Sequence, residues 1–123
     1  MNQKIESFTD LIAWKKAHVL AVKIYKITKT FPQKEIYSLT NQMRRSATSI
    51  SSNVAEGFSR QSKKEKIQFY YTAKGSLTEL QNQLLISRDV GYLEKELFSN
   101  TASQTVEISK LINGLIKSIK KTK

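Results

Sequence analysis

Apolar residues recur every three to four positions along four long stretches of the chain, which is the spacing of one face of an α-helix. In the first stretch, Leu11, Trp14 and Ala17 begin an apolar stripe, and most of the lysines lie off it. The last stretch alternates gaps of three and four from Phe98 to Ile119, a heptad pattern typical of packed helices. The pattern therefore predicts helices over about residues 10–29, 35–58, 62–91 and 94–120.

Residues that start or stop helices lie between these stretches. Asp10 is expected to cap the first helix, and Pro32 ends it because the residue before a proline disfavours the α-helical conformation. Ser62 and Glu65 have the spacing of a capping box, in which each side chain accepts a hydrogen bond from a backbone amide. Gly91 is expected to close the third helix in a left-handed conformation. These residues predict short connections between the helices.

The second stretch has an unusual inward face, because small and polar residues occupy many of its core positions. The residues at helical spacing are Leu39, Met43, Ser46, Ile50, Asn53 and Gly57. Serine and threonine hydroxyls compete for backbone hydrogen bonds and disfavour the helix. We therefore predict a bend or break near Ser49–Ser52.

A second group of small residues lies in the middle of the third stretch. Gly75 costs a helix roughly 1 kcal/mol relative to alanine, and Ala73 and Ser76 stand beside it. Two small-residue patches on adjacent helices allow the two backbones to approach closely. We therefore predict that the second and third helices pack closely through Ser46, Gly57, Gly75 and Ser76.

Four helices of this length with short connections predict an all-α fold. The expected architecture is one antiparallel up-down-up-down four-helix bundle domain spanning residues 1–123. Leu111 and Ile116 lie off the main apolar seam of the fourth helix. This second apolar surface leaves room for a second partner, such as another subunit.

Composition narrows the class of protein. The chain has 123 residues, one proline, four glycines and no cysteine, which fits long helices and excludes disulfides, thiolate metal sites and a cysteine nucleophile. The N-terminal residues lack the apolar run of a signal peptide, and no stretch has the length of a membrane span. We expect a soluble, cytoplasmic protein with no membrane partner.

The sequence pattern offers no set of residues for catalysis, metal binding or cofactor binding. A catalytic serine needs a nearby base, and the single histidine, His18, is flanked by Ala17 and Val19 on the first helix. Lys15 stands where a di-iron Glu-x-x-His motif would need a glutamate, and the glycines form no phosphate-binding loop. We therefore expect no enzyme activity, no cofactor and no metal.

The chain is strongly basic. With 21 lysines and arginines against 10 acidic residues, its formal charge is +11, which is typical of nucleic-acid-binding proteins and also of proteins that use charge only for solubility. Exposed basic residues either contact phosphates or face solvent. The candidate nucleic-acid-binding residues are Lys15, Lys16, Lys23, Lys26, Arg60, Lys63, Lys64, Lys117, Lys120 and Lys121. Because Trp14 and Tyr25 are expected in the core, base stacking on single strands is not expected.

Five charged or polar residues are expected to pair with one another. Glu56 and Glu79 lie next to the small-residue patches, and a buried arginine needs a partner because an unpaired buried charge costs several kcal/mol. Two carboxylates can also perform acid–base chemistry, but we favour structural pairing. The expected structural polar network, at a helix or subunit interface, comprises Arg44, Arg45, Asn53, Glu56 and Glu79.

Three segments carry a family resemblance: "LIAWKKAHVLAVKIYKITKTFP", "YSLTNQMRRSATSISSNVAEGFSR" and "SKKEKIQFYYTAKGSLTELQNQL", followed by "GYL". Over about residues 8–120 the chain resembles the 23S rRNA intervening-sequence proteins, also called the S23 ribosomal protein family. The matching positions are Trp14, Tyr25, Phe31, Pro32, Arg44, Arg45, Asn53, Glu56, Gly57, Gly75, Ser76 and Glu79. Many members carry proline where this chain has Ser51, so the resemblance leaves the bend in the second helix open.

The resemblance implies an antiparallel four-helix bundle that assembles into a ring, commonly a homopentamer. It also implies kinship with the accessory protein of diversity-generating retroelements, a basic pentameric bundle that associates with a reverse transcriptase and nucleic acid. On this basis we expect a non-enzymatic ring that binds RNA or DNA through phosphates. The alternative is an assembly or adaptor module that binds another protein and has no nucleic-acid role.

Overall fold

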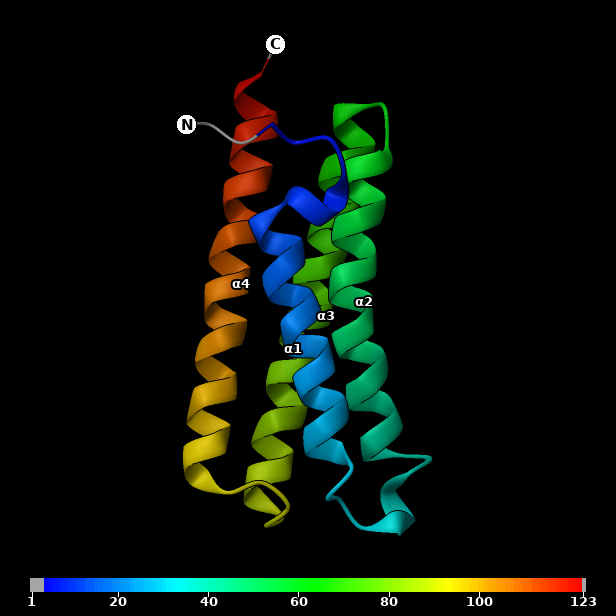
Figure 1. Ribbon diagram of the computed structural model, residues 1–123, viewed down its shortest axis with the longest axis vertical. Helices are drawn as coiled ribbons and strands as arrows, with labels where there is room; N and C mark the ends of the chain where they lie inside the picture. Colours follow the sequence, from blue (N-terminus) through cyan, green and yellow to red (C-terminus); the bar gives the residue numbers. More distant parts are fainter. Residues whose placement is uncertain (1–3, 123) are drawn as a thin grey trace.

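Four long α-helices make up most of the computed structural model, which describes residues 4–122 (Figure 1). They are α1 (Ile12–Thr28), α2 (Leu39–Ser59), α3 (Lys63–Asp89) and α4 (Lys95–Lys121). Two short 3-10 turns, η1 (Phe8–Asp10) and η2 (Gln33–Glu35), precede α1 and α2. Residues 4–122 contain no β-strand, so the fold class is all-α, as the sequence predicts.

The four helices lie side by side, and each packs against the next one along the chain (Figure 1). α1 also packs against α4, so the four helices surround one core. Short connections reverse the chain direction between neighbours. The α2–α3 contact is the most extensive of the four, and the α1–α4 contact is the smallest. This arrangement fits the predicted antiparallel bundle.

Aliphatic side chains from all four helices fill the space between them. Leu20, Ile50, Leu80 and Ile112, one from each helix, are completely buried. Burial of one such side chain stabilises the folded state by roughly 1.5–3 kcal/mol. The apolar stripes of the sequence are therefore the core-facing surfaces of the helices.

The start of α1 differs from the prediction that Asp10 caps it. Ser7 caps the preceding turn η1, and the Asp10 carboxylate accepts hydrogen bonds from the backbone amides of Glu6 and Ser7 at 2.9 and 3.0 Å. These backbone hydrogen bonds hold the pKa of Asp10 below its usual range. α1 begins at Ile12, and Leu11 supplies no side-chain cap. Asp10 therefore fixes the turn that leads into α1, not the helix itself.

α2 begins later than predicted and continues without a break. The turn η2 occupies residues predicted as the first turn of the helix, so α2 begins at Leu39. The predicted break near Ser49–Ser52 is absent, because the residues form one uninterrupted α-helix. The hydroxyl of Ser51 donates to the carbonyl of Thr48 at 3.1 Å. This bond satisfies the hydroxyl within the preceding turn, and the helix continues through it.

Capping residues fix the two ends of α3. Ser62 accepts a hydrogen bond from the Glu65 amide at 3.1 Å, as predicted, but the Glu65 carboxylate accepts from the Ser62 hydroxyl at 3.2 Å and not from its amide. The capping box is therefore half formed. Gly91 has a φ of +88°, and the Tyr92 amide donates to the Ser87 carbonyl at 2.9 Å. This Schellman ending confirms the predicted role of Gly91.

Candidate functional site

α2 and α3 are in tight contact where Gly57 faces Tyr70. A Cβ on Gly57 would lie 2.6 Å from Cε1 of the Tyr70 ring and 3.2 Å from the Lys66 carbonyl oxygen. Further along the same contact, the Ser76 hydroxyl donates to Oγ of Ser49 at 2.9 Å. Small residues therefore bring these two helices together.

Gly75 takes no part in this contact, and its predicted packing role against α2 is wrong. It lies on the exposed side of α3, and no atom of residues 4–122 lies within 4 Å of the position that a Cβ would occupy. Ser46 and Ser76 are buried, at 7% and 6% exposure. The helical repeat explains the difference, because Ala73 and Ser76 are three residues apart and share a face that Gly75 does not.

A polar groove of about 300 Å³ lies on the surface formed by α2 and α3. Its lining residues are Gln42, Arg45, Ser46, Ser49, Ser76, Glu79 and Gln83. Arg45 and Glu79 are exposed, and neither forms a hydrogen bond or ion pair with another residue of the described range 4–122. Gln83 is 8% exposed, and its Oε1 is buried without a partner in the same range. The groove thus combines two opposite charges with a buried acceptor that the chain itself does not satisfy.

The five residues predicted as one polar network form no hydrogen bond or ion pair with one another within residues 4–122. Asn53 donates its side-chain amide to the Ser49 carbonyl at 2.8 Å, and Glu56 pairs with Arg60 at 3.0 Å. Each of these partners is four residues away on the same chain, where helical neighbours meet. The predicted network is therefore wrong for the contacts within one chain.

Arg44 links α2 to α1. Its Nε donates to Oγ1 of Thr28 at 2.9 Å, and its guanidinium carbon lies 4.8 Å from the centre of the Tyr25 ring. Tyr25 is 44% exposed, so its predicted place in the core is also wrong. The guanidinium stacks on a surface ring, a geometry that gives a cation–π contact. Arg44 therefore has a structural role at the α1–α2 contact.

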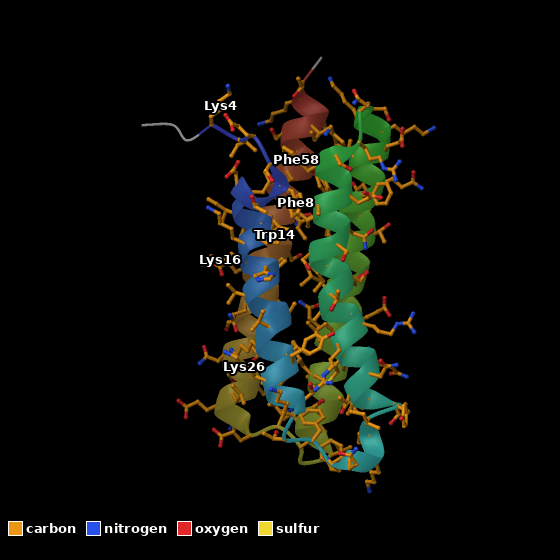
Figure 2. All side chains as sticks on the ribbon, turned by 45° about the vertical axis from the view of Figure 1, so that its right-hand side comes forward. Lys4, Phe8, Trp14, Lys16, Lys26 and Phe58 are labelled. Atoms are coloured by element: carbon orange, nitrogen blue, oxygen red, sulfur yellow. The ribbon has the colours of Figure 1, made fainter. Side chains whose placement is uncertain are left out.

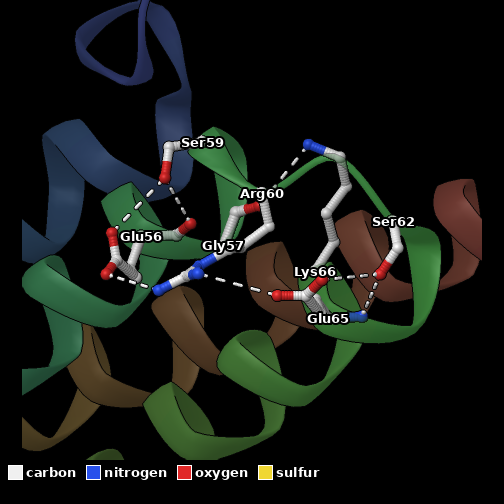
Figure 3. Close-up of polar contacts among 7 residues, drawn as sticks. All are labelled: Glu56, Gly57, Ser59, Arg60, Ser62, Glu65 and Lys66. Atoms are coloured by element: carbon white, nitrogen blue, oxygen red, sulfur yellow. Dashed lines mark hydrogen bonds and ion pairs between the residues drawn. The ribbon is translucent and has the colours of Figure 1, made fainter.

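Arg60 holds the α2–α3 connection, with its guanidinium between two carboxylates (Figure 3). Nη2 lies 3.0 Å from Glu56, and Nη1 lies 3.6 Å from Glu65. Lys66 donates to the Phe58 carbonyl at 2.7 Å, which satisfies one of the last carbonyls of α2. Because its charge is paired within the chain, Arg60 does not fit the predicted role of a free phosphate contact.

The lysines predicted on α1 do not form one free basic surface. Lys16 pairs with Glu107 of α4 at 3.8 Å, and Lys23 donates to the Gln104 side chain of α4. Burial lowers the pKa of Lys23. Figure 2 shows Lys16 and Lys26 along the outer side of α1. Other exposed residues on this helix include Ile12, Lys15, Val19 and Val22. Aliphatic side chains therefore interrupt the basic surface of α1.

The lysines predicted at the second connection and in the tail come together at one end of the molecule. The last turn of α4 lies beside the first turn of α3 (Figure 1), and Lys63 donates to the carbonyl oxygen of Thr122. Lys120 donates to the Tyr71 hydroxyl at 3.2 Å. The exposed residues of this group, called the basic end below, are Lys63, Lys64, Lys117, Lys120 and Lys121.

Sequence reasoning missed Tyr71, which lies at the basic end. Its side chain is 48% exposed, and the ammonium groups of Lys74 and Lys120 lie 5.9 and 5.7 Å from the ring centre. Tyr70, the preceding residue, is buried against α2. The sequence does carry a signal for an exposed ring beside a lysine. The signal is an aromatic residue that lies outside the apolar stripe and three residues before a lysine.

The described chain offers no metal site and no membrane-spanning helix. Within residues 4–122 no three His, Asp or Glu side chains are grouped so that they could hold a metal ion. In the same range, no helix combines the length and the apolar character needed to cross a membrane. His18 is exposed and stacks on Trp14, with ring centres 4.8 Å apart, and Phe8 packs edge-on against Trp14 at 5.3 Å. His18 thus belongs to a surface aromatic stack near the start of α1.

Comparisons with known proteins agree with this architecture. The family model described as 23S rRNA-intervening sequence protein matches residues 9–114. No match is found among the curated proteins. A solved structure from Bacteroides thetaiotaomicron VPI-5482, described as a protein with unknown function from the S23 ribosomal protein family, is similar with a TM-score of 0.80 and 25% sequence identity. The similarity covers 86% of this chain and 96% of that chain.

Proposed function

The chain belongs to the 23S rRNA-intervening sequence protein family, and we propose that it is a non-enzymatic scaffold that binds RNA or DNA and assembles into a homo-oligomeric ring. The basic end is the observation that carries nucleic-acid binding. The groove between α2 and α3 supports assembly. Each surface has its own experiment, so the two parts of the proposal can fail separately.

The position of the lysines at the basic end supports a role beyond helix stability. Lys117, Lys120 and Lys121 lie in or near the last turn of α4, where positive charge interacts favourably with the helix dipole. Lys63 and Lys64 lie in the first turn of α3, where positive charge is unfavourable. Lys63 is hydrogen-bonded to the Thr122 carbonyl at the C-terminal end of α4, where its charge is favourable. Helix stability therefore does not explain Lys64. A nucleic-acid phosphate backbone that contacts the first turn of α3 and the last turn of α4 would explain it.

The carboxylate next to this pair in the sequence is already paired with another cation. Glu65 follows Lys64 directly, but its side chain faces the Arg60 guanidinium at 3.6 Å. Lysines that bind phosphates release counterions, so affinity falls as log salt rises and depends little on sequence. The proposed contacts are therefore electrostatic and not specific for bases.

Titration of labelled RNA and DNA at low and high salt tests nucleic-acid binding. The test variant replaces Lys117, Lys120 and Lys121 with glutamine, and the control replaces Lys29, Lys34 and Lys95, exposed lysines at the opposite end of the bundle. We expect weaker binding and a shallower salt dependence in the test variant than in the control. Absence of binding by the unmodified protein at micromolar concentration, or equal losses in both variants, would contradict the proposal.

The α2–α3 groove supports assembly because three of its polar groups lack partners within residues 4–122. Arg45 supplies a positive charge, Glu79 a negative charge and Gln83 a buried acceptor. A second copy that docks against this groove would supply the missing partners. Measurement of the mass in solution tests the ring, and a single-chain mass at tens of micromolar would contradict it. If the mass is that of one chain, the same groove favours the alternative, an adaptor that binds another protein.

A further inference from the structure

Tyr71 presents an aromatic ring to solvent in the middle of positively charged groups. It lies on α3 two turns after the Lys63 and Lys64 pair, and the last turns of α4 bring Lys120 to its hydroxyl. With 48% of its side chain exposed, it is not part of the core. An exposed ring with adjacent lysines is the combination that binds single-stranded nucleic acid, where bases stack on aromatic side chains and lysines follow the backbone.

Lys120 does not lie over the face of the Tyr71 ring. Its Nζ lies 3.2 Å from the hydroxyl oxygen but 5.7 Å from the ring centre. An ammonium this close to the hydroxyl and this far from the centre lies beyond the hydroxyl end of the ring. Lys74, 5.9 Å from the centre, is also at the limit of a cation–π contact. Lys120 therefore lies beyond the edge of the ring, and neither ammonium comes closer than 5.7 Å to the ring centre.

The surface of α3 beside Tyr71 is open as well. Gly75 lies one helical turn further along α3, and nothing lies within 4 Å of the position that its Cβ would occupy. A larger residue there would stand next to the ring, because residues four apart on a helix are neighbours. Gly75 packs against no other part of residues 4–122. A glycine here weakens the helix, and it keeps the surface beside the ring open.

We propose that Tyr71 is a stacking platform for an unpaired base of single-stranded RNA or DNA, with Lys74 and Lys120 beside the neighbouring phosphates. This inference rests on the proposed nucleic-acid function and adds the strandedness of the ligand. A duplex keeps its bases stacked on one another, so it reaches the lysines but not the ring. Tyr71 therefore makes the basic end prefer single strands. This differs from the expectation of no base stacking, which considered only Trp14 and Tyr25.

The test compares Tyr71→Leu with Tyr71→Phe, each titrated with single-stranded and duplex oligonucleotides of RNA and of DNA. The phenylalanine variant keeps the ring and loses only the hydroxyl. We expect Tyr71→Leu to lose roughly ten-fold in single-strand affinity and to bind duplex unchanged, whereas Tyr71→Phe binds both like the unmodified protein. A fluorescent base analogue in the single strand should be quenched by the unmodified protein and by Tyr71→Phe, but not by Tyr71→Leu.

Three outcomes would overturn this inference while leaving the proposed function intact. They are unchanged single-strand binding in Tyr71→Leu, an equal loss for duplex and single strand, and a loss in Tyr71→Phe as large as in Tyr71→Leu. Circular dichroism of each variant checks that the helices are retained. Failure of the unmodified protein to bind any of the four oligonucleotides would overturn the proposed function and this inference together.

Discussion

The α-carbon of Gly57 lies so close to the Tyr70 ring that a methyl group attached to it would come within 2.6 Å of a ring carbon. We expect Gly57→Ala to lower the free energy of unfolding by about 1–2 kcal/mol, because the overpacking cost exceeds the gain in helix propensity. Urea denaturation followed by circular dichroism measures this change. An alanine variant as stable as the unmodified protein would show that Tyr70 can move away at no cost.

Gly75 and Gly114 provide the matched test, since both lie inside helices and nothing lies within 4 Å of the position that a Cβ would occupy at either one. We expect Gly75→Ala and Gly114→Ala each to raise the free energy of unfolding by about 0.5–1 kcal/mol through helix propensity alone. The measurement is the same urea denaturation. A loss of stability in Gly75→Ala would contradict this expectation and would indicate that another copy of the chain packs against that surface.

Arg60 and Lys64 are four residues apart and carry the same charge, but we expect their substitution by glutamine to affect different properties. The first should affect stability and the second nucleic-acid affinity. Arg60 lies between Glu56 and Glu65 and 4.8 Å from the centre of the Phe69 ring. Arg60→Gln should lower the free energy of unfolding by about 0.5–1.5 kcal/mol and change nucleic-acid affinity little. Lys64→Gln should lower affinity without loss of stability. Thermal denaturation and oligonucleotide titration of both variants check this, and weaker binding by Arg60→Gln alone would refute it.

Arg45 and Glu79 should respond to charge reversal as a pair if the α2–α3 groove joins two copies. Arg45→Glu and Glu79→Arg should each weaken association, because like charges then meet across the contact. The double variant should restore it, since the pair is rebuilt with the charges exchanged. Mass measured over a range of protein concentrations reports association. Equal masses for the unmodified protein, the two single variants and the double variant would show that the contact between copies lies outside this groove.

Glu35 and Tyr92 make stability depend on pH. The Tyr92 hydroxyl donates to the Glu35 carboxylate at 2.8 Å, and hydrogen bonds from Ser38 and Tyr92 hold the pKa of Glu35 below its usual value. A lowered pKa means that the carboxylate stabilises the fold above the unfolded-state pKa and that this contribution is lost as pH falls through the folded-state pKa. Glu35→Gln should therefore be less stable than the unmodified protein near neutral pH, with the difference shrinking in acid.

Urea midpoints measured from neutral to acidic pH check the Glu35 prediction, and Tyr92→Phe is the control that removes the hydrogen bond but keeps the carboxylate. The pKa of Tyr92 is raised, first by its hydrogen bond to Glu35. Its contribution is therefore present below the unfolded-state pKa and lost as pH rises through the folded-state pKa. A constant difference between Glu35→Gln and the unmodified protein across the acid range would contradict this account.

The sequence predicts the helices well because their signals are periodic and local. The apolar stripes repeat with the helical period, and Ser62 and Gly91 act on backbone groups within a few residues of themselves. Asp10 shows where local signals become ambiguous. Ser7 and Asp10 have the spacing that starts a helix, but their mutual capping here closes a single turn.

The candidate site is harder to predict because it depends on which face of each helix a residue occupies and on which partner a long side chain reaches. Gly75 lies two residues past Ala73, roughly 200° around the helix, so a cluster in sequence is not a cluster on one face. Glu56 pairs with Arg60, four residues away, and not with Arg44 or Arg45 as predicted. The meeting of Lys63 with the end of α4 depends on how the whole bundle closes. No short segment contains that information.

The α2–α3 connection also bears on the order in which the chain folds. Its contacts, including Arg60 with Glu56 and Glu65 and Lys66 with the Phe58 carbonyl, join residues close together in sequence. Bringing such residues together costs little chain entropy, and local contacts form early in folding. We expect α2 and α3 to form a helical hairpin first, onto which α1 and α4 then dock. The most extensive helix contact in the molecule is thus also the one that can form with the shortest loop.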